Sequence, residues 1–391
     1  MGKVVSQARD ELLNHIVPYW TALKDDEYGG FYGYKSFDLK VDKKADKGVI
    51  LHSRILWFFS ACYEVFGDEK CRELADHAFE YIKKYCVDYE YGGVYWMTSF
   101  DGSVSDDMKH TYNIAFAVYA LSAYYNAAKV REALHLAQRL FDDIESKTPD
   151  DYGCGEAFTR NWKPAENEAL SENGIIAKKT MNSVLHLIEA YTELYRANRS
   201  EIVAQKLKYQ LKIVEQKIFD GQNNALRVFF DEKFDVLGDI HSFGHDIEAS
   251  WLMDKAVEML GDDELTASFH DIDLRLAENI YNVGLENGAL NNERENDKID
   301  KTRIWWVQAE AVVGFVNAYQ HSGDEKYLEA AADIWDYIKQ NIIDKRSGGE
   351  WYSELSSDGN PHDWKEETGP WKCPYHNGRM CLELIKRGVD F

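Results

Sequence analysis

Three histidines of this chain stand in segments that are otherwise apolar: His186, His245 and His376. His245 precedes Glu248 by three residues, and residues three apart on a helix share a face. A carboxylate beside an imidazole orients the ring and raises its pKa, which suits a general base near neutral pH. We therefore predict that Glu248 holds His245 in position. A purely structural hydrogen-bonded pair is the alternative.

Other polar and aromatic side chains accompany these histidines in matching positions. Burying a polar group among apolar side chains costs free energy unless the group faces a cavity or has a hydrogen-bonding partner. Six apolar segments carry such groups near the same end, which favours one shared site over six separate coincidences. The candidates besides the histidines and Glu248 are Arg54, Tyr112, Asn182, Trp305, Trp306, Glu310 and Trp371.

A metal site is one alternative use of these residues. His241 and His245 are four apart, and Glu248 follows, which is a spacing compatible with zinc. Phe243 and Gly244 lie between the two histidines, however, and a glycine near a helix start places His241 before the regular turns. We therefore expect no metal and no other cofactor.

A glycoside hydrolase and a carbohydrate-binding module are two further alternatives. Hydrolysis needs two carboxyl groups flanking the bond, and Glu248 and Glu310 are candidates. A hydrolase has no need for several histidines facing the cavity. A binding module would explain the aromatic residues, but a buried Arg54 and several imidazoles exceed what stacking on a ring requires.

A repeat along the chain indicates how these residues are positioned. Six turns, mostly carrying glycine, run into an aromatic or apolar strand, and successive turns are 63, 61, 70, 65 and 60 residues apart. Such a period means that one supersecondary unit is used six times. The turns are marked by Gly29, Gly92, Gly153, Asn223, Gly288 and Gly348.

The segments between the turns have helical periodicity, with apolar residues at i, i+3, i+4 and i+7. We predict twelve helices, at 5–24, 47–66, 68–86, 109–127, 130–147, 173–198, 200–219, 242–260, 262–282, 301–322, 324–343 and 374–388. The odd helices carry charged outer faces and the even helices are more apolar. This alternation predicts an all-α fold: an (α/α)6 barrel in one domain, 1–391, with short β-hairpins at one rim beside the N-terminal ends of the inner helices.

The amino-acid composition limits the classes of molecule that the protein can bind. The chain has 391 residues and a formal net charge of −23, and no basic stripe offsets it. We therefore expect no nucleic acid and no anionic membrane as a partner, but a neutral small molecule. No apolar run approaches the roughly 18 residues of a membrane span. Six cysteines without a C-x-x-C pair indicate reduced thiols, so we expect a cytoplasmic protein, and we expect a monomer.

Five longer motifs resemble the N-acylglucosamine 2-epimerase superfamily, from about residue 9 to the C-terminus. The resemblance is greatest to the members that act on β-1,4-linked disaccharides such as cellobiose and lactose, and it implies metal-free isomerisation of the reducing-end sugar in an (α/α)6 barrel. The motifs are His52-Ser-Arg-Ile-Leu-Trp57, Met181-Asn-Ser-Val-Leu-His-Leu-Ile-Glu-Ala-Tyr191, Gly244-His-Asp-Ile-Glu-Ala-Ser-Trp251, Trp305-Trp-Val-Gln-Ala-Glu310 and Gly369-Pro-Trp-Lys-Cys-Pro-Tyr-His-Asn-Gly-Arg-Met380.

The resemblance also implies roles for individual residues. His245 and His376 match the acid/base pair of the family, Arg54 an arginine near the sugar oxygens, and His186 a further essential histidine. Either Trp305 or Trp306 faces the ligand. Sugar-contacting or supporting positions are matched by Tyr112, Asn182, Glu248, Trp306, Glu310 and Trp371.

The implied reaction interconverts glucose and mannose at the reducing end by ring opening, C2 proton abstraction to an enediolate, and reprotonation on the opposite face. An N-acylglucosamine 2-epimerase or an aldose–ketose isomerase would use the same histidines. The motifs alone therefore leave these two alternatives open.

Overall fold

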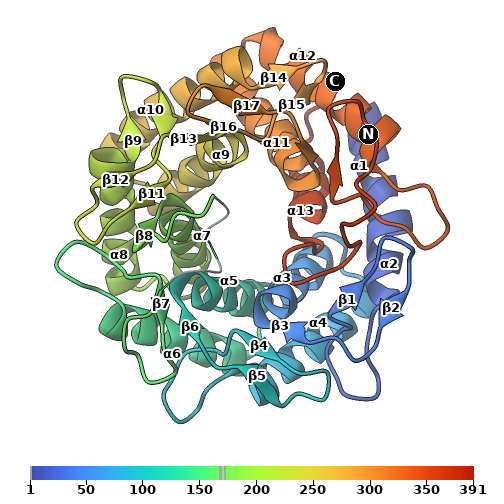
Figure 1. The fold of residues 1–391 in the computed structure, drawn as a ribbon, viewed down its shortest axis with the longest axis vertical. Coiled ribbons are helices and arrows are strands. Elements are labelled where there is room, and N and C mark those ends of the chain that lie inside the picture. The colour runs from blue at the N-terminus through green and yellow to red at the C-terminus, as the bar shows by residue number, and fades with distance from the viewer. Residues whose placement is uncertain (1, 167–169, 171–172) are drawn as a thin grey trace.

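Two concentric rings of helices form the body of the molecule in the computed structural model, which describes residues 2–166, 170 and 173–391 (Figure 1). The inner helices contact one another in order around the ring, and α13 contacts α3, so the ring closes. The predicted (α/α)6 barrel is thus confirmed. Inner helices are apolar on most sides because they pack against neighbours and against the outer ring. They are α3 (Val49–Phe66), α5 (Thr111–Ala128), α7 (Met181–Asn198), α9 (Phe243–Leu260), α11 (Trp305–Ser322) and α13 (Tyr375–Arg387).

The outer helices are amphipathic, with one buried face against the inner ring and charged residues toward solvent. Four of them contain a π-helical turn, at Leu12–Ile16, Ile82–Cys86, Val214–Ile218 and Ile338–Ile342. The first of these joins α1 to α2 in one continuous helix. The outer ring consists of α1 (Lys3–Glu11), α2 (Val17–Ala22), α4 (Glu69–Tyr81), α6 (Arg131–Lys147), α8 (Glu201–Ile213), α10 (Asp263–Val283) and α12 (Glu325–Tyr337).

Tight turns connect each inner helix to the following outer helix. Gly67, Gly261 and Gly323 adopt positive φ angles of 65°, 64° and 70°, which end the inner helices in the left-handed conformation that glycine tolerates best. The aspartate after each glycine then caps the next helix: Asp68 accepts a hydrogen bond from the Lys70 N–H, and Asp262 accepts one from the Leu265 N–H. Each glycine–aspartate pair thus ends one helix and begins the next.

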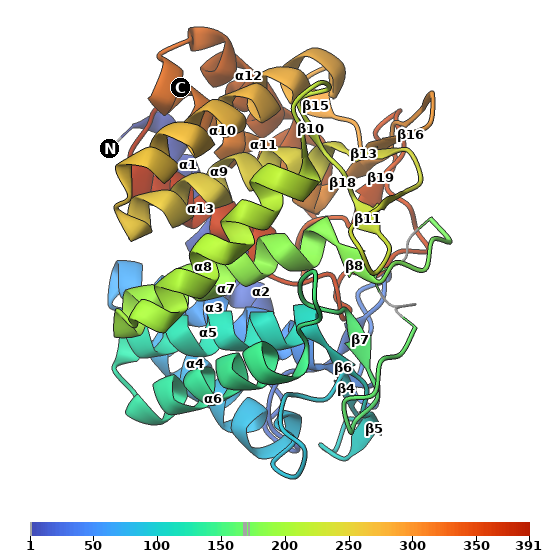
Figure 2. The same ribbon diagram turned by 90° about the vertical axis from the view of Figure 1, so that its left-hand side faces the viewer.

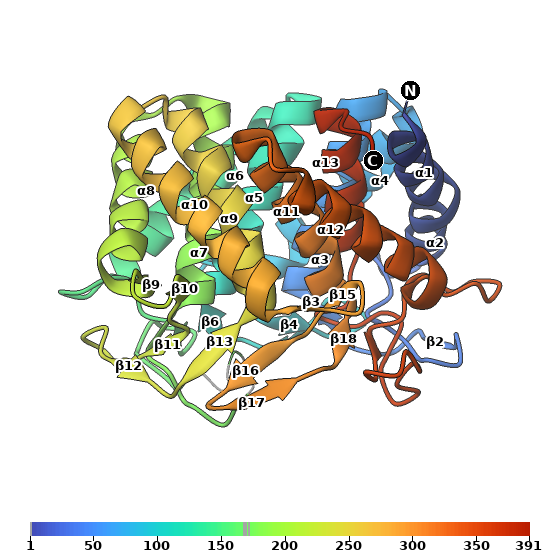
Figure 3. The ribbon, with the colours of Figure 1, turned by 90° about the horizontal axis from the view of Figure 1, so that it is seen from above.

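Short strands gather at the end of the barrel where the inner helices begin (Figures 2 and 3). They are β1 (Tyr34–Lys35), β2 (Val41–Asp42), β3 (Lys47–Gly48), β4 (Met97–Thr98), β5 (Val104–Asp106), β6 (Lys109–His110), β7 (Ala157–Phe158), β8 (Lys179–Thr180), β9 (Phe219–Asp220), β10 (Ala225–Leu226), β11 (Phe229–Phe230), β12 (Val236–Leu237), β13 (Ile240–Ser242), β14 (Leu285–Glu286), β15 (Ala289–Leu290), β16 (Glu293–Glu295), β17 (Lys298–Asp300), β18 (Arg303–Ile304) and β19 (Glu354–Leu355).

The strand that leads into an inner helix pairs with a strand of the next repeat. These antiparallel pairs are β3–β4, β6–β7, β8–β11, β13–β16 and β18–β19, and a bridge between Lys35 and Thr368 joins the last repeat to the first. The pairing links neighbouring hairpins around the rim. It therefore fixes the first turn of each inner helix relative to the next.

Two predicted helix starts are wrong by several residues. The helix predicted at 173–198 begins at Met181, and the one at 301–322 begins at Trp305. In both cases the preceding residues pair as strands, β8 with β11 and β18 with β19. Because the backbone N–H and C=O groups of these residues are paired between strands at the rim, they do not join the helix.

Within the described residues, one helix, α3, is long and apolar enough by composition to cross a membrane. It carries His52 and Arg54 and 78% of it is buried inside the barrel, as expected for a core helix of the inner ring.

Candidate active site

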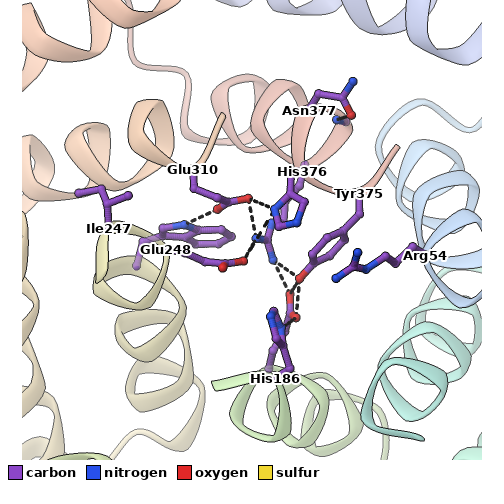
Figure 4. A network of polar contacts seen from close by, with 12 residues as sticks. Arg54, His186, Ile247, Glu248, Glu310, Tyr375, His376 and Asn377 are labelled. Carbon is purple, nitrogen blue, oxygen red and sulfur yellow. Dashed lines mark hydrogen bonds and ion pairs between the residues drawn. The ribbon is translucent and has the colours of Figure 1, made fainter. Parts of the chain in front are cut away.

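The first turns of five inner helices place polar and aromatic side chains at the strand end of the ring. These rim residues are Tyr112, Asn182, His245, Trp306 and His376, each at the second or third position of its helix. About one turn deeper lie Arg54, His186, Glu248, Glu310 and Arg379. In Figure 4 the side chains of Arg54, His186, Glu248, Glu310, Tyr375 and His376 converge between the inner helices, whereas Asn377 points away from them.

Each of the three predicted histidines is anchored through Nδ1. In the described part of the chain, Nε2 of each ring has no hydrogen-bond partner, so one nitrogen of each ring stays available to a ligand. The three anchors are Glu189 Oε2 at 3.0 Å from His186, Ser242 Oγ at 2.7 Å from His245, and Glu310 Oε1 at 2.7 Å from His376.

The predicted contact between Glu248 and His245 is wrong. His245 Nδ1 pairs instead with the hydroxyl of Ser242, which directly precedes α9. The Glu248 carboxylate pairs with the guanidinium of Arg379, and the imidazole near it is that of His376, 3.9 Å from Nδ1 to Oε1. A buried carboxylate gains more from a permanent cation than from a neutral imidazole, which explains the choice.

Arg379 is the charge centre of the deeper layer. Its guanidinium donates to Glu189 and Glu310, each at 2.6 Å, and also to Glu248. Burial alone would raise the pKa of Glu189, but Arg379 and His186 lower it to about 2. Burial and the charge of Glu310 raise the pKa of Glu248 to about 7, and Arg379 opposes them only in part.

The environment keeps two rim histidines neutral. Burial, with a contribution from the charge of His186, lowers the pKa of His245 to about 3. Burial and the charges of Arg379 and Arg54 lower the pKa of His376 well below its ordinary value. The prediction that a carboxylate raises the pKa of His245 is therefore wrong, because its partner is a neutral hydroxyl. Neutral imidazoles with a free Nε2 can accept protons at neutral pH.

Arg54 supplies a buried positive charge near these rings. Its Nη2 donates to the Tyr112 hydroxyl at 2.9 Å, and its guanidinium lies 4.2 Å from the centre of the Phe116 ring. Interaction with Tyr112 and Cys373 keeps its pKa above the ordinary value although burial opposes this. Because this cation is already in position, it can stabilise an oxyanion that forms nearby.

Of the two candidate tryptophans, Trp306 contacts both rim histidines. Its ring centre lies 4.8 Å from that of His245 and 5.4 Å from that of His376. A Cβ at Gly244 would come within 2.6 Å of the Trp306 ring, so glycine allows this close approach. Trp305 meets only His376, edge-on at 6.2 Å.

Two further predicted positions face the same region. The Trp371 ring lies 6.0 Å from that of Tyr112, whose hydroxyl accepts a hydrogen bond from Arg54. The Oδ1 atom of Asn182 is buried without a hydrogen-bond partner in the described structure. A buried polar atom without a partner is costly, and a ligand hydroxyl would satisfy it.

Three residues of the site were given no role by the sequence analysis: Glu189, Tyr375 and Arg379. The Tyr375 hydroxyl donates to Glu189 at 2.6 Å, and both contact Arg379. The spacing of His186 and Glu189 equals that of His245 and Glu248, so the same i, i+3 argument could have identified Glu189. Arg379 follows His376 by three residues, but its partners come from three other helices and leave no local signal.

The geometry also bears on the two alternative uses of these carboxylates, a metal site and a glycoside hydrolase. Glu248, Glu310 and His376 offer ligand atoms within 4.8 Å of one another, but the guanidinium of Arg379 already binds both carboxylates. His241 takes no part, because it pairs with Asp246 at 2.7 Å. For hydrolysis, two carboxyl groups should flank a bond. Here they share one cation, so the arrangement favours proton transfer by the histidines.

The fold and the site define an (α/α)6-barrel protein built for acid–base chemistry. Residues 29–378 match the family model described as N-acylglucosamine 2-epimerase. A cellobiose 2-epimerase of Ruminococcus albus is 62% identical over 387 residues, which cover 99% of this chain and 100% of the relative. One of Eubacterium cellulosolvens is 45% identical, covering 97% and 98%.

A solved structure titled as a sugar epimerase from a ruminal bacterium superposes with a TM-score of 0.98 at 62% identity, covering 99% of this chain and 100% of that one. The chain belongs to the N-acylglucosamine 2-epimerase family.

Proposed function

We propose that this chain epimerises the reducing-end sugar of a β-1,4-linked disaccharide such as cellobiose at C2, interconverting glucose and mannose. The observation that carries the proposal is the pair of imidazoles, His245 and His376, with Nδ1 held by the protein and Nε2 free, each beside the Trp306 ring. Identity of 62% over the full length with a cellobiose 2-epimerase supports this substrate class.

The sugar must first open to its aldehyde. Opening moves a proton from the O1 hydroxyl to the ring oxygen, and a rim imidazole can relay it through Nε2. A neutral imidazole is needed for this step, which agrees with the lowered pKa values of both rim histidines.

Proton removal from C2 is the central step. One rim histidine takes the proton while the C–H electron pair forms the C1–C2 double bond and the carbonyl oxygen becomes an oxyanion. The other histidine, which has taken up a proton from water once the substrate is bound, returns it to the opposite face of C2. The two imidazoles therefore work in opposite protonation states and exchange these states in the reverse reaction.

The developing oxyanion needs donors that are already in place. Arg54 carries a permanent charge in a buried position, and His186 presents its free Nε2 from α7. Glu189 orients His186, and Glu310 orients His376. Glu248 helps to balance the charge of Arg379, and Trp306 or Trp371 provides an apolar face for a sugar ring.

Further parts of the proposal concern the molecule as a whole. The inner helices close into one ring around the described site residues, so we propose one catalytic domain over residues 1–391 that acts as a monomer. All six cysteines are free, which supports a reducing, cytoplasmic location. No step needs a metal or another cofactor, because no electron leaves the substrate.

Product analysis tests the proposal. We expect cellobiose, incubated with the protein and EDTA, to yield glucosyl-mannose, identified by NMR of the reducing-end protons. A ketose as main product would indicate an aldose–ketose isomerase that protonates C1. Free glucose would indicate a hydrolase. Turnover of an acetamido sugar but not of cellobiose would indicate an N-acylglucosamine 2-epimerase.

A further inference from the structure

Two histidines and two carboxylates meet at the end of the barrel opposite the strands. Asp254 and Glu258 stand one turn apart on α9, His270 stands on α10, and His321 stands in the last turn of α11. One ligand atom of each lies within 4.8 Å of the others. We call these four residues the distal cluster.

The two imidazoles converge on one carboxylate. His270 Nε2 lies 2.7 Å from Asp254 Oδ1, and His321 Nε2 lies 2.7 Å from Asp254 Oδ2. The ring centres of the two histidines are 4.3 Å apart. The His270–Asp254 approach does not have hydrogen-bond geometry, and both atoms are buried. The ligand atoms of these side chains therefore converge on one small region, as the ligands of one ion would.

A second buried carboxylate lies beside the cluster. Asp273 follows His270 by one turn on α10, is 4% exposed, and has no hydrogen-bond partner for either carboxylate oxygen in the described structure. Burial and the charge of Asp254 raise its pKa well above the ordinary value. A buried carboxyl group without a partner is costly, and a cation bound at the neighbouring cluster would lower that cost.

The distal cluster is separate from the catalytic residues. His245 and Asp254 are nine residues apart on α9, which corresponds to about 13 Å along a helix. Glu258 and His321 are exposed and His270 is half-buried, so an ion can reach the cluster from solvent. The cluster spans two neighbouring hairpins, since α9 and α10 belong to one and α11 to the next.

We propose that the distal cluster binds a divalent transition metal ion of the zinc class, with His270, His321 and Asp254 as ligands and Glu258 completing the set. Imidazole and carboxylate ligands in fourfold arrangement suit zinc, whereas calcium and magnesium prefer oxygen ligands alone. The ion ties α9, α10 and α11 together and stabilises the barrel without entering the reaction.

Metal binding and thermal unfolding of the untagged, full-length protein test this proposal. After dialysis against zinc chloride and removal of free ion, we expect one zinc per chain. We expect the Tm to rise with zinc concentration and not with magnesium. The His270→Ala/His321→Ala double variant should lose both effects and keep epimerisation of cellobiose. His135→Ala, at an exposed histidine on α6, is the matched control and should keep both.

One variant separates the distal cluster from the catalytic residues, which also include a histidine beside two carboxylates. His376→Ala should keep the bound zinc. Zinc that is lost in His376→Ala but kept in the double variant would overturn the proposal, and so would the absence of zinc binding by the unmodified protein. Because the readouts are bound metal and Tm, failure here is distinct from failure of the proposed epimerisation.

Discussion

At the scale of single residues, burial rather than a carboxylate partner sets the protonation of the rim histidines. His245 has only the Ser242 hydroxyl at Nδ1, and His376 lies near the charges of Arg379 and Arg54. Both imidazoles are therefore neutral in the free protein, and one of them has to take up a proton from water before it can reprotonate C2.

The low pKa of His245 predicts the pH dependence. Protonation inactivates a base, so a lowered pKa preserves activity to lower pH. With a pKa of about 3 for His245, we expect kcat/KM to hold as pH falls through the ordinary histidine value of about 6.5. The measurement is kcat/KM for cellobiose from pH 4 to 8.

The Ser242→Asp variant tests the cause. A carboxylate at Nδ1 should raise the pKa of His245 and move the acid limb up by about 1 to 3 pH units. An acid limb near pH 6.5 in the unmodified protein, unmoved by Ser242→Asp, would show that His245 is not the group that titrates.

At the scale of elements, buried ion pairs connect the rim turns to the inner helices. Lys47 Nζ donates to Asp25 Oδ2 at 2.7 Å, and Lys109 Nζ donates to Asp88 Oδ2 at 2.9 Å, with all four side chains fully buried. In each pair the aspartate accepts N–H groups of a glycine turn, and the lysine lies just before an inner helix. The same buried aspartate–lysine pair thus recurs in two of the repeats.

Removing one partner of such a pair should be costly. We expect Lys47→Met to destabilise the fold by roughly 3–5 kcal/mol, because Asp25 remains buried without its cation. Lys40→Met is the control: its pair with Asp38 is 3.8 Å long and mostly exposed, so its loss should cost at most about 1 kcal/mol. Urea unfolding measures both.

The Asp25→Asn/Lys47→Met double variant completes the cycle and should recover part of the loss. Equal destabilisation by Lys47→Met and Lys40→Met would contradict the account of this pair.

Local sequence patterns predicted the elements better than the contacts between them. The helix ends at Gly67 and Gly261 and the caps at Asp68 and Asp262 involve neighbours in sequence, so they could be predicted. The partner of Glu248 could not, because it depends on a guanidinium that α13 brings across the ring. The start of α7 could not be predicted either. The residues just before it pair as strand β8 with β11, and the helix begins only after that strand.

At the scale of the whole molecule, closure of the ring brings the two ends of the chain together (Figure 1). The Val4 N–H donates to Asp390 Oδ1 at 2.7 Å, and α1 packs against α13. The last inner helix also carries His376 and Arg379. The site is therefore complete only when the first and last repeats have met.

Adjacent termini predict a tolerated circular permutation. Joining the ends by a short flexible linker and opening the chain at Lys129–Val130, in the turn between α5 and α6, should leave the inner ring intact. We expect this permutant to fold and to keep most of its epimerisation rate on cellobiose.

A second permutant, opened between Ser242 and Phe243, provides the comparison. It should lose activity because the break lies where β13 positions His245. Equal activity of the two permutants would show that rim pairing does not position the site.

Deuterium exchange at C2 tests the central claim, that two histidines act on opposite faces of one carbon. In D2O the unmodified protein should convert cellobiose to glucosyl-mannose with deuterium at C2, seen by NMR. His245→Ala and His376→Ala should each lose epimerisation at least about 100-fold while staying folded. One variant should then exchange the C2 proton only in the glucose epimer, and the other only in the mannose epimer. Near-normal epimerisation by either variant, or a product that keeps the original C2 proton, would contradict the account.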